Sequence, residues 1–358
     1  MIDVAVVGLG PAGAHYARRA AQQGQSVVAF ERGSVGEPLA CSGHVSRDLW
    51  EFLPDAAPDR LRQHEIRGAR FHVAPEDDGY LFYRDEPISN AIDRVDLDRL
   101  LVELAAEAGA EIRTNHLVTA VEEGPESVSL TVRGPDGVER VEAAMVVGAD
   151  GPQSTVRREL GLPEPERFLV GTLRHVPEPD HADHVDVYLT VPGFFAWRIP
   201  RGDAGVEYGL AGPPGYDVVD HLDNRLAGHG VPDGERFGGH IPIGPPERVH
   251  TDRAILLGDA AGQTKPFTGG GILYGLRAAE IAARKLDPSA LDTTAYERAW
   301  RAELGTEIRL GRWLRRAYSL PDPLARLGLS TLAGEIDVHM DEPSSLFSKD
   351  ALTTLFRG

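Results

Sequence analysis

The N-terminal segment carries the pattern that most restricts the fold. An apolar stretch at residues 2–7 is followed by Gly8, Gly10 and Gly13 in the spacing GxGxxG, and then by an expected helix at 12–23. Between a strand and a helix, the first glycine permits a tight turn and the second lets a pyrophosphate approach the backbone. The third lets the helix pack closely on the strand. The helix N-terminus then faces the phosphates, so the segment predicts a dinucleotide-binding βαβ fold.

Glu31 closes the second expected strand, SVVAFE at 26–31, and lies 18 residues after Gly13. A carboxylate at that strand end accepts hydrogen bonds from a ribose 2′-OH and disfavours a 2′-phosphate. The position therefore argues against NADP at this site. Glu31 alone does not separate FAD from NAD.

Two later segments favour FAD. GADGPQSTVRREL at 148–160 resembles the GADGxxSxVR segment of glutathione-reductase-like and hydroxylase-like flavoproteins, and LLGDAAGQTKPFTGGGI at 256–272 resembles their GD segment. In those families the Asp of the GD segment, here Asp259, binds the ribityl chain of FAD; its alternative role is a helix N-cap. The glycines at 269–271 precede an expected helix, whose N–H groups can stabilise the negative charge of reduced flavin.

The GD segment also separates the subfamilies. Aromatic hydroxylases usually read GDAAHxxxPxxGxGxN, whereas Gly262 and Ile272 stand here at the His and Asn positions. The chain instead resembles the geranylgeranyl reductases, whose Cys-Ala/Ser-Gly segment is similar to residues 41–43 and whose YxWxFP motif is similar to FAWRIP at 195–200. PSSLF at 343–347 fits the tails of archaeal members.

Flavin-dependent halogenases are the nearest rival, because FxWxIP is one residue from their WxWxIP. Halogenases use a Lys upstream of that motif to handle hypohalous acid. In this chain Lys265 is the first lysine and follows the motif. The sequence therefore argues against a halogenase.

The resemblance implies an FAD-dependent reductase that saturates isolated C=C bonds of an isoprenoid chain, in an archaeal ether lipid, its precursor or a menaquinone side chain. It assigns cofactor binding to Gly8, Gly10, Ala12, Gly13, Glu31, Arg32, Cys41, Ser42, Arg94, Val118, Asp259, Gly271 and Ile272. Substrate contacts fall on Phe195, Trp197 and Pro200. Cys41 is otherwise a small buried hydrophobe, and the two aromatic residues are otherwise sheet core. No catalytic side chain is identified.

Two other functions stay open. One is an FAD monooxygenase of an aromatic or hydrophobic substrate, which the missing His and Asn disfavour. The other is a redox-neutral isoprenoid cyclase or flavin carrier. The electron donor is not specified among ferredoxin, deazaflavin and nicotinamide, because no second nicotinamide-binding fingerprint is visible.

The expected architecture is α/β, with a discontinuous Rossmann-like FAD-binding domain, an inserted antiparallel β-sheet substrate domain and a helical C-terminal tail. The FAD-binding domain takes residues 1–65, 88–165 and 249–290. The substrate domain takes 66–87 and 166–248, of which 167–243 reads as all-β. Residues 291–358 form the C-terminal region.

Charge and composition bound the partners. The net charge is −18, which disfavours nucleic acid, and only three of 37 basic residues are Lys, a composition that favours a halophilic source over a merely GC-rich genome. Neither a metal-binding cluster nor an 18-residue apolar run is present. One Cys and no basic leader predict a cytoplasmic protein.

Residues 309–318, RLGRWLRRAY, are either a helix on the membrane surface or a helix packed on the protein. The helical period places Arg309, Arg312, Arg315 and Arg316 opposite Leu310, Trp313, Leu314 and Ala317.

Overall fold

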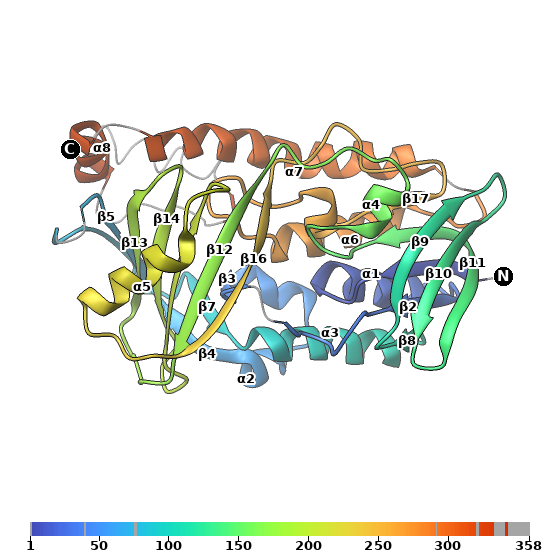
Figure 1. Ribbon diagram of the computed structural model, residues 1–358, viewed down its shortest axis with the longest axis horizontal. Helices are drawn as coiled ribbons and strands as arrows, with labels where there is room; N and C mark the ends of the chain where they lie inside the picture. Colours follow the sequence, from blue (N-terminus) through green and yellow to red (C-terminus); the bar gives the residue numbers. More distant parts are fainter. Residues whose placement is uncertain are drawn as a thin grey trace.

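A computed structural model describes residues 2–38, 41–74, 77–290, 292–319, 322–332 and 341–342. Two seven-stranded sheets lie at opposite ends of the molecule, with a small three-stranded sheet between them (Figure 1). The PSSLF segment at 343–347, and most of the tail after 332, lie outside the described residues.

The first sheet is the predicted dinucleotide-binding sheet. Its parallel part runs in the order β8-β2-β1-β11-β17, and β11 continues into an antiparallel meander with β10 and β9. The bounds are β1 Ile2–Val7, β2 Val27–Phe30, β8 Glu111–Arg113, β9 Leu117–Glu123, β10 Val128–Gly134, β11 Gly137–Gly148 and β17 Ala254–Leu256. β17 follows β11 by about 100 residues, so the domain built on this sheet is assembled from distant parts of the chain.

Small side chains let three helices cover this sheet. α1 (Pro11–Gln22) buries Ala14, Ala17 and Ala20, and it packs against α3 (Arg94–Glu107) and α6 (Ile272–Lys285). Methyl groups on α1 let the helix axes approach closely. The amphipathic pattern of residues 95–108 predicts a helix, and both ends of α3 agree with it within one residue. α3 begins where Asp93 accepts a hydrogen bond from the N–H of Asp96 at 2.9 Å.

The second sheet is the predicted substrate sheet. Its order is β16-β12-β15-β14-β13-β5-β6, antiparallel except where β13 pairs with β5. The bounds are β5 Gly68–His72, β6 Tyr80–Tyr83, β12 Arg167–Val176, β13 His184–Val191, β14 Phe194–Pro200, β15 Val206–Gly212 and β16 Glu235–Ile243. The alternating pattern of residues 66–84 predicts an antiparallel hairpin, and the structure confirms it as β5 and β6, which extend the edge of this sheet.

The prediction that 167–243 is entirely β is wrong. α5 (Val218–Gly228) interrupts it, and Asp217 caps the helix by accepting from the N–H of Asp220 at 3.1 Å. Leu222 and Leu226, one turn apart, bury the helix against the second sheet together with Leu210. The period of these leucines is helical, and it was hidden among the strands on either side.

The third sheet, β3-β7-β4, was not predicted. It joins β3 (His44–Ser46), β7 (Ser89–Ile92) and β4 (Arg62–Ile66) beside the short helices η1 (Arg47–Phe52) and α2 (Ala57–Leu61). Strands of three to five residues carry too few alternations to stand out in a sequence. This sheet connects the two large ones.

The C-terminal region crosses both large sheets. Figure 1 shows α7 (Thr293–Arg315) running along one border of the molecule, and α8 (Asp322–Leu332) near β5 and β13. The 3₁₀ turn η3 (Arg316–Ser319) lies between them. None of the helices that the structure describes has the length and apolarity to cross a membrane.

Candidate active site

A cavity of about 1000 Å³ lies between the first and second sheets. One wall comes from the start of α1, residues 149–151, the 3₁₀ turn η2 (Gly258–Ala261) and the start of α6. The other comes from β12, β14 and β16 of the second sheet. A site between two lobes is the usual place for a cofactor to meet its substrate.

The glycine-rich turn has the geometry that a pyrophosphate requires. A Cβ added at Gly8, where φ is +93°, would overlap the carbonyl of Ala149, and one added at Gly13 would overlap the carbonyl of Gly8. A Cβ at Gly10 would meet nothing within 4 Å, and Gly10 lines the cavity. Gly8 and Gly13 therefore serve packing, whereas Gly10 leaves space at the N-terminus of α1.

The carboxylate of Glu31 is hydrogen-bonded to the backbone of this turn. Its Oε2 accepts the N–H of Leu9 at 2.9 Å, and its Oε1 accepts the N–H of Gly33 at 3.4 Å. The carboxylate is thereby fixed beside the glycine-rich turn, next to the end of β2. Its remaining acceptor capacity suits a ribose diol.

Arg94 brings a buried cation to the same cavity. Its Nη1 lies 2.6 Å from Asp98 Oδ1, and both side chains are buried. The Nε of Arg94 is buried with no hydrogen-bond acceptor among the described residues. A buried guanidinium with an unsatisfied N–H fits an additional anionic acceptor, as the phosphates of a dinucleotide would supply. Cys41 and Ser42 line the cavity nearby.

Asp259 lies at the start of α6. A Cβ added at Gly271 would lie 2.8 Å from its Oδ1, so the carboxylate rests on the glycine that precedes the helix. Burial raises the pKa of Asp259 to about 6, and the nearby charge of Arg94 opposes the rise. A partly buried carboxylate that lines the cavity suits a hydrogen-bond donor, which a ribityl hydroxyl would provide.

The GADG segment is built around a capping residue. Asp150 accepts from Ser154 Oγ at 2.5 Å and from the N–H of Thr155 at 2.7 Å, which fixes the start of α4 (Thr155–Glu159). Arg157 then donates to the carbonyls of Ala260 at 3.0 Å and Pro152 at 2.8 Å. The two motifs that favoured FAD are therefore joined by one buried guanidinium.

The facing wall is aromatic. Phe195 and Trp197 of β14 line the cavity together with Ile199, and the rings of Phe195 and Trp197 meet edge to face at 5.9 Å. The indole of Trp197 lies against Gly209, where an added Cβ would overlap it. Its Nε1 donates to Glu207 at 2.8 Å. The indole is thus fixed both by packing and by a hydrogen bond.

Comparison with known proteins settles the family. Residues 1–200 match the family model described as FAD binding domain. The chain is 31% identical to digeranylgeranylglycerophospholipid reductase 2 of Methanothermobacter thermautotrophicus over 339 residues, covering 86% of this chain and 85% of the relative. It is 32% identical to digeranylgeranylglycerophospholipid reductase 1 of Methanopyrus kandleri over 348 residues, covering 87% and 88%. The chain belongs to the geranylgeranyl reductase family of FAD-binding proteins. FAD is its cofactor.

Solved structures agree on the fold. A geranylgeranyl bacteriochlorophyll reductase-like protein from Thermoplasma acidophilum superposes with a TM-score of 0.82 at 21% identity, covering 99% of this chain and 95% of that one. A flavin-dependent halogenase superposes with a TM-score of 0.71 at 20% identity, covering 99% and 76%. At these identities the likeness shows a shared fold.

Most of the residues that the family resemblance assigned lie together in this reductase-family cavity. Those lining it are Gly10, Ala12, Cys41, Ser42, Arg94, Asp259, Gly271, Ile272, Phe195 and Trp197. Gly8 and Gly13 lie in the glycine-rich turn, and Glu31 is hydrogen-bonded to that turn. None of these three residues lines the cavity. Their contacts with FAD and substrate remain predictions.

Besides Gly8, Gly13 and Glu31, three assigned residues do not line the cavity. Arg32 is exposed beside Glu31, and Pro200 is buried at the end of β14. Val118 is a buried ladder residue of β9, opposite Val132, so only its backbone could reach a ligand. The chain nearest Glu31 is instead His116, whose N–H donates to the Glu31 carbonyl at 2.8 Å.

One network that the sequence did not reveal joins the two walls. Arg201 donates to the carbonyls of Ser42 at 2.6 Å and Ile92 at 2.8 Å, and to Glu207 at 3.2 Å. Glu207 is fully buried and is also 2.8 Å from His175 Nε2. Arg201 therefore ties the end of β14 to the Cys41-Ser42 segment. Its position directly after the FAWRIP motif is the only signal that could have marked it.

Two further groups lie near the cavity. Lys265 Nζ is 2.5 Å from Asp341 Oδ1 in a buried ion pair, which fixes part of the C-terminal region against the GD segment. His44 Nε2 is 2.8 Å from Ser89 Oγ. Burial, and then the charge of Lys265, lower the pKa of His44 to about 4, so its imidazole is neutral near pH 7 and cannot supply a proton as imidazolium.

Two of the four arginines of 309–318 contact the protein itself, as expected for a helix packed on the protein. Arg312 pairs with Glu166, and Arg315 donates to the carbonyls of Pro266 at 3.1 Å and Gly193 at 3.0 Å. Gly311 packs on Pro266, which brings this turn of α7 against the GD segment. The side chain of Ala317 is outside those described.

Proposed function

We propose that the protein saturates isolated C=C bonds in the geranylgeranyl chains of a membrane lipid or its precursor. The observation that supports this most is the single cavity that joins the predicted flavin-binding residues to the aromatic wall of β14. Reduced FAD would supply a hydride to one alkene carbon, while the other takes a proton. The chain's own residues hold the alkene: Phe195 and Trp197 exclude water and offer an apolar surface, as an isoprenoid requires.

Mass spectrometry tests this function directly. The FAD-loaded protein is reduced chemically without oxygen and given a digeranylgeranylglycerol lipid. A gain of two hydrogen atoms per double bond supports the proposal. A product that gains oxygen when air is admitted would indicate a monooxygenase, and an unchanged mass with reduced flavin still present would indicate a cyclase or carrier.

Trp197 is expected to control turnover rather than cofactor binding. Trp197→Ala removes most of one cavity wall, so we expect the flavin spectrum to persist while alkene reduction falls about tenfold or more, or stops at fewer saturated bonds. Trp197→Phe keeps the aromatic wall but loses the bond to Glu207, and should show a smaller defect. Equal loss of flavin and activity in Trp197→Ala would mean that the residue serves only the core.

We also propose that the protein collects its lipid by peripheral contact with a membrane through the end of α7 and through α8. Trp313, Leu324 and Leu327 expose 57%, 53% and 64% of their surface there. Trp313 and Leu324 also line the cavity, so the exposed apolar surface continues into the site. Because Arg312 pairs with Glu166 and Arg315 donates to two backbone carbonyls, apolar contact is the larger contribution to membrane binding.

Liposome flotation at high salt tests this contact. Trp313→Glu is expected to reduce the floating fraction severalfold, because a carboxylate at headgroup depth opposes apolar insertion. Val138→Glu is the matched control, since Val138 is 67% exposed on the meander of the first sheet. Equal flotation of folded wild type and Trp313→Glu would remove α7 from the contact.

A further inference from the structure

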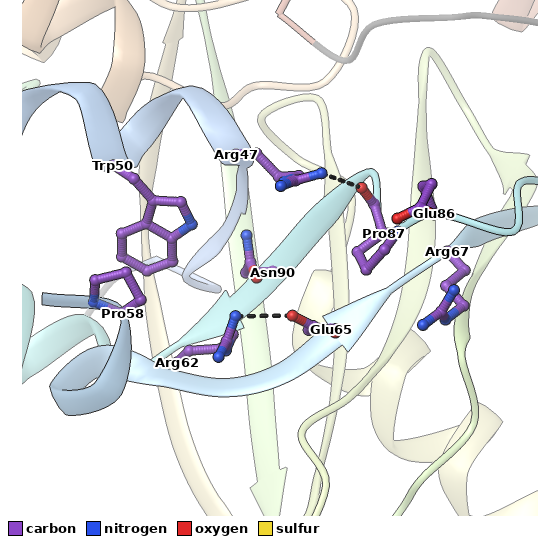
Figure 2. A pocket seen from close by; sticks show the side chains of 9 residues that line it. All are labelled: Arg47, Trp50, Pro58, Arg62, Glu65, Arg67, Glu86, Pro87 and Asn90. Carbon is purple, nitrogen blue, oxygen red and sulfur yellow. Dashed lines mark hydrogen bonds and ion pairs between the residues drawn. The ribbon is translucent and has the colours of Figure 1, made fainter. Parts of the chain in front are cut away.

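A second, smaller cavity opens on the face of the three-stranded sheet. Its volume is about 470 Å³, and three arginines line it: Arg47, Arg62 and Arg67 (Figure 2). Arg47 and Arg67 also line the large cavity, whereas Arg62 does not. The two cavities therefore share a wall at Arg47, Arg67 and Pro87, and this wall is basic.

Among the residues that the structure describes, the two shared arginines have no carboxylate partner. Arg47 donates only to the carbonyl of Pro87, at a long 3.4 Å, and neither it nor Arg67 forms an ion pair with any residue that the structure describes. Figure 2 shows them on either side of Pro87. Arg62, by contrast, lies 2.7 Å from Glu65.

The backbone that carries Arg67 is fixed. Its N–H donates to the carbonyl of Asp183 at 2.6 Å, and its carbonyl accepts the N–H of Arg84 at 2.9 Å. It sits in the one-residue step between β4 and β5, where the third sheet joins the second. Arg84 lines the large cavity beside it. The side chain of Arg67 thus extends from a fixed backbone, which lowers the entropy cost of binding an anion.

The opposite end of the large cavity has no such charge in its described lining. It is formed by Trp313 and Leu314 of α7 and by Leu324 and Leu329 of α8. In Figure 1, α7 and α8 follow the upper border, whereas β4 and β7 lie toward the lower one. The cavity is therefore polarised, with arginines at one end, the aromatic wall of β14 between, and apolar side chains at the other end.

From this polarity we infer that Arg47 and Arg67 bind the phosphate-bearing headgroup of the lipid whose isoprenoid chain occupies the large cavity. Arginine suits a phosphate because its planar fork donates two parallel N–H bonds. Glu86 lines only the small cavity, so it stays outside the shared wall. The inference rests on the proposed function and deepens it, because it makes these arginines the residues that separate charged from uncharged polyprenyl substrates.

A matched pair of substrates tests the inference with the FAD-loaded, reduced protein at one fixed salt concentration. The substrates are digeranylgeranylglyceryl phosphate and the corresponding uncharged alcohol. Arg47→Gln and Arg67→Gln are each expected to raise KM for the phosphate about tenfold and to leave KM for the alcohol unchanged. Arg62→Gln is the control, since Arg62 forms an ion pair with Glu65 and does not line the large cavity.

Every outcome bears on the arginines. Equal changes with both substrates, no change, or an equal effect of Arg62→Gln would overturn the inference. Inorganic phosphate as competitor separates a headgroup site from a site for the free ion: competition at micromolar phosphate would assign the free ion and overturn the headgroup. If wild type reduces neither lipid, the proposed function fails. Lipid binding, followed by the change in flavin absorption, then still tests both arginines.

Discussion

Gly10→Ala is expected to weaken FAD retention strongly while leaving the fold intact. The backbone at Gly10 has φ −68°, which any residue can adopt, and an added Cβ meets no protein atom within 4 Å. The space that the methyl group would fill is the one left for the pyrophosphate. Overlap with a tightly held ligand costs about 1–3 kcal/mol or more, so the affinity should fall about tenfold to a hundredfold.

Flavin content after dialysis and circular dichroism of the same samples measure this effect. Gly8→Ala serves as the contrasting variant, because its methyl group would overlap the Ala149 carbonyl at a positive φ and should damage the fold itself. Wild-type flavin occupancy in Gly10→Ala would place the pyrophosphate elsewhere.

Arg201→Met is expected to have the largest effect on stability. The substitution removes the cation that pairs with the completely buried Glu207. It also removes the hydrogen bonds to the carbonyls of Ser42 and Ile92. Removing one partner of a buried ion pair costs about 3–5 kcal/mol. The free energy of unfolding should fall by that amount, or the protein should fail to accumulate in folded form.

Urea unfolding of Arg201→Met and of Arg62→Met makes the comparison. Arg62 belongs to an exposed pair, whose loss costs about 0–1 kcal/mol. The double variant Arg201→Met, Glu207→Gln should recover part of the loss, since it removes the stranded carboxylate. Equal midpoints for the two single variants would contradict the structural role given to Arg201.

Local sequence signals predicted most of the elements. HVDVYLTV at 184–191 and FFAWRIP at 194–200 stand out in the sequence as strands because turns rich in Pro and Gly delimit them. The structure gives β13 and β14 the same bounds. α5 was missed because it is short and lies between strands, so its two leucines read as part of an alternating pattern. The third sheet was missed because each of its strands is too short to show a period.

The motifs predicted which residues line the site better than how the site is held. Gly10, Arg94, Asp259 and Trp197 each belong to a recognisable segment, and all four line one cavity. Arg201 and Ser42, however, are 159 positions apart, and no sequence motif around either residue predicts their contact. Contacts of this separation depend on how two sheets are docked, which local patterns do not encode.

The bridge made by Arg201 has a consequence for how this architecture can diverge. The turn after β14 supplies Arg201, whose buried guanidinium binds the segment at 41–42. A change in the sequence or position of one segment therefore requires a matching change in the other. Consider a chimaera of two relatives that takes β12–β16 from one parent and residues 41–44 from the other. Its Arg201 and its Ser42 carbonyl would then come from different parents. We expect such chimaeras to accumulate poorly unless both segments come from the same parent. Substrate preference and flavin environment would then be inherited together.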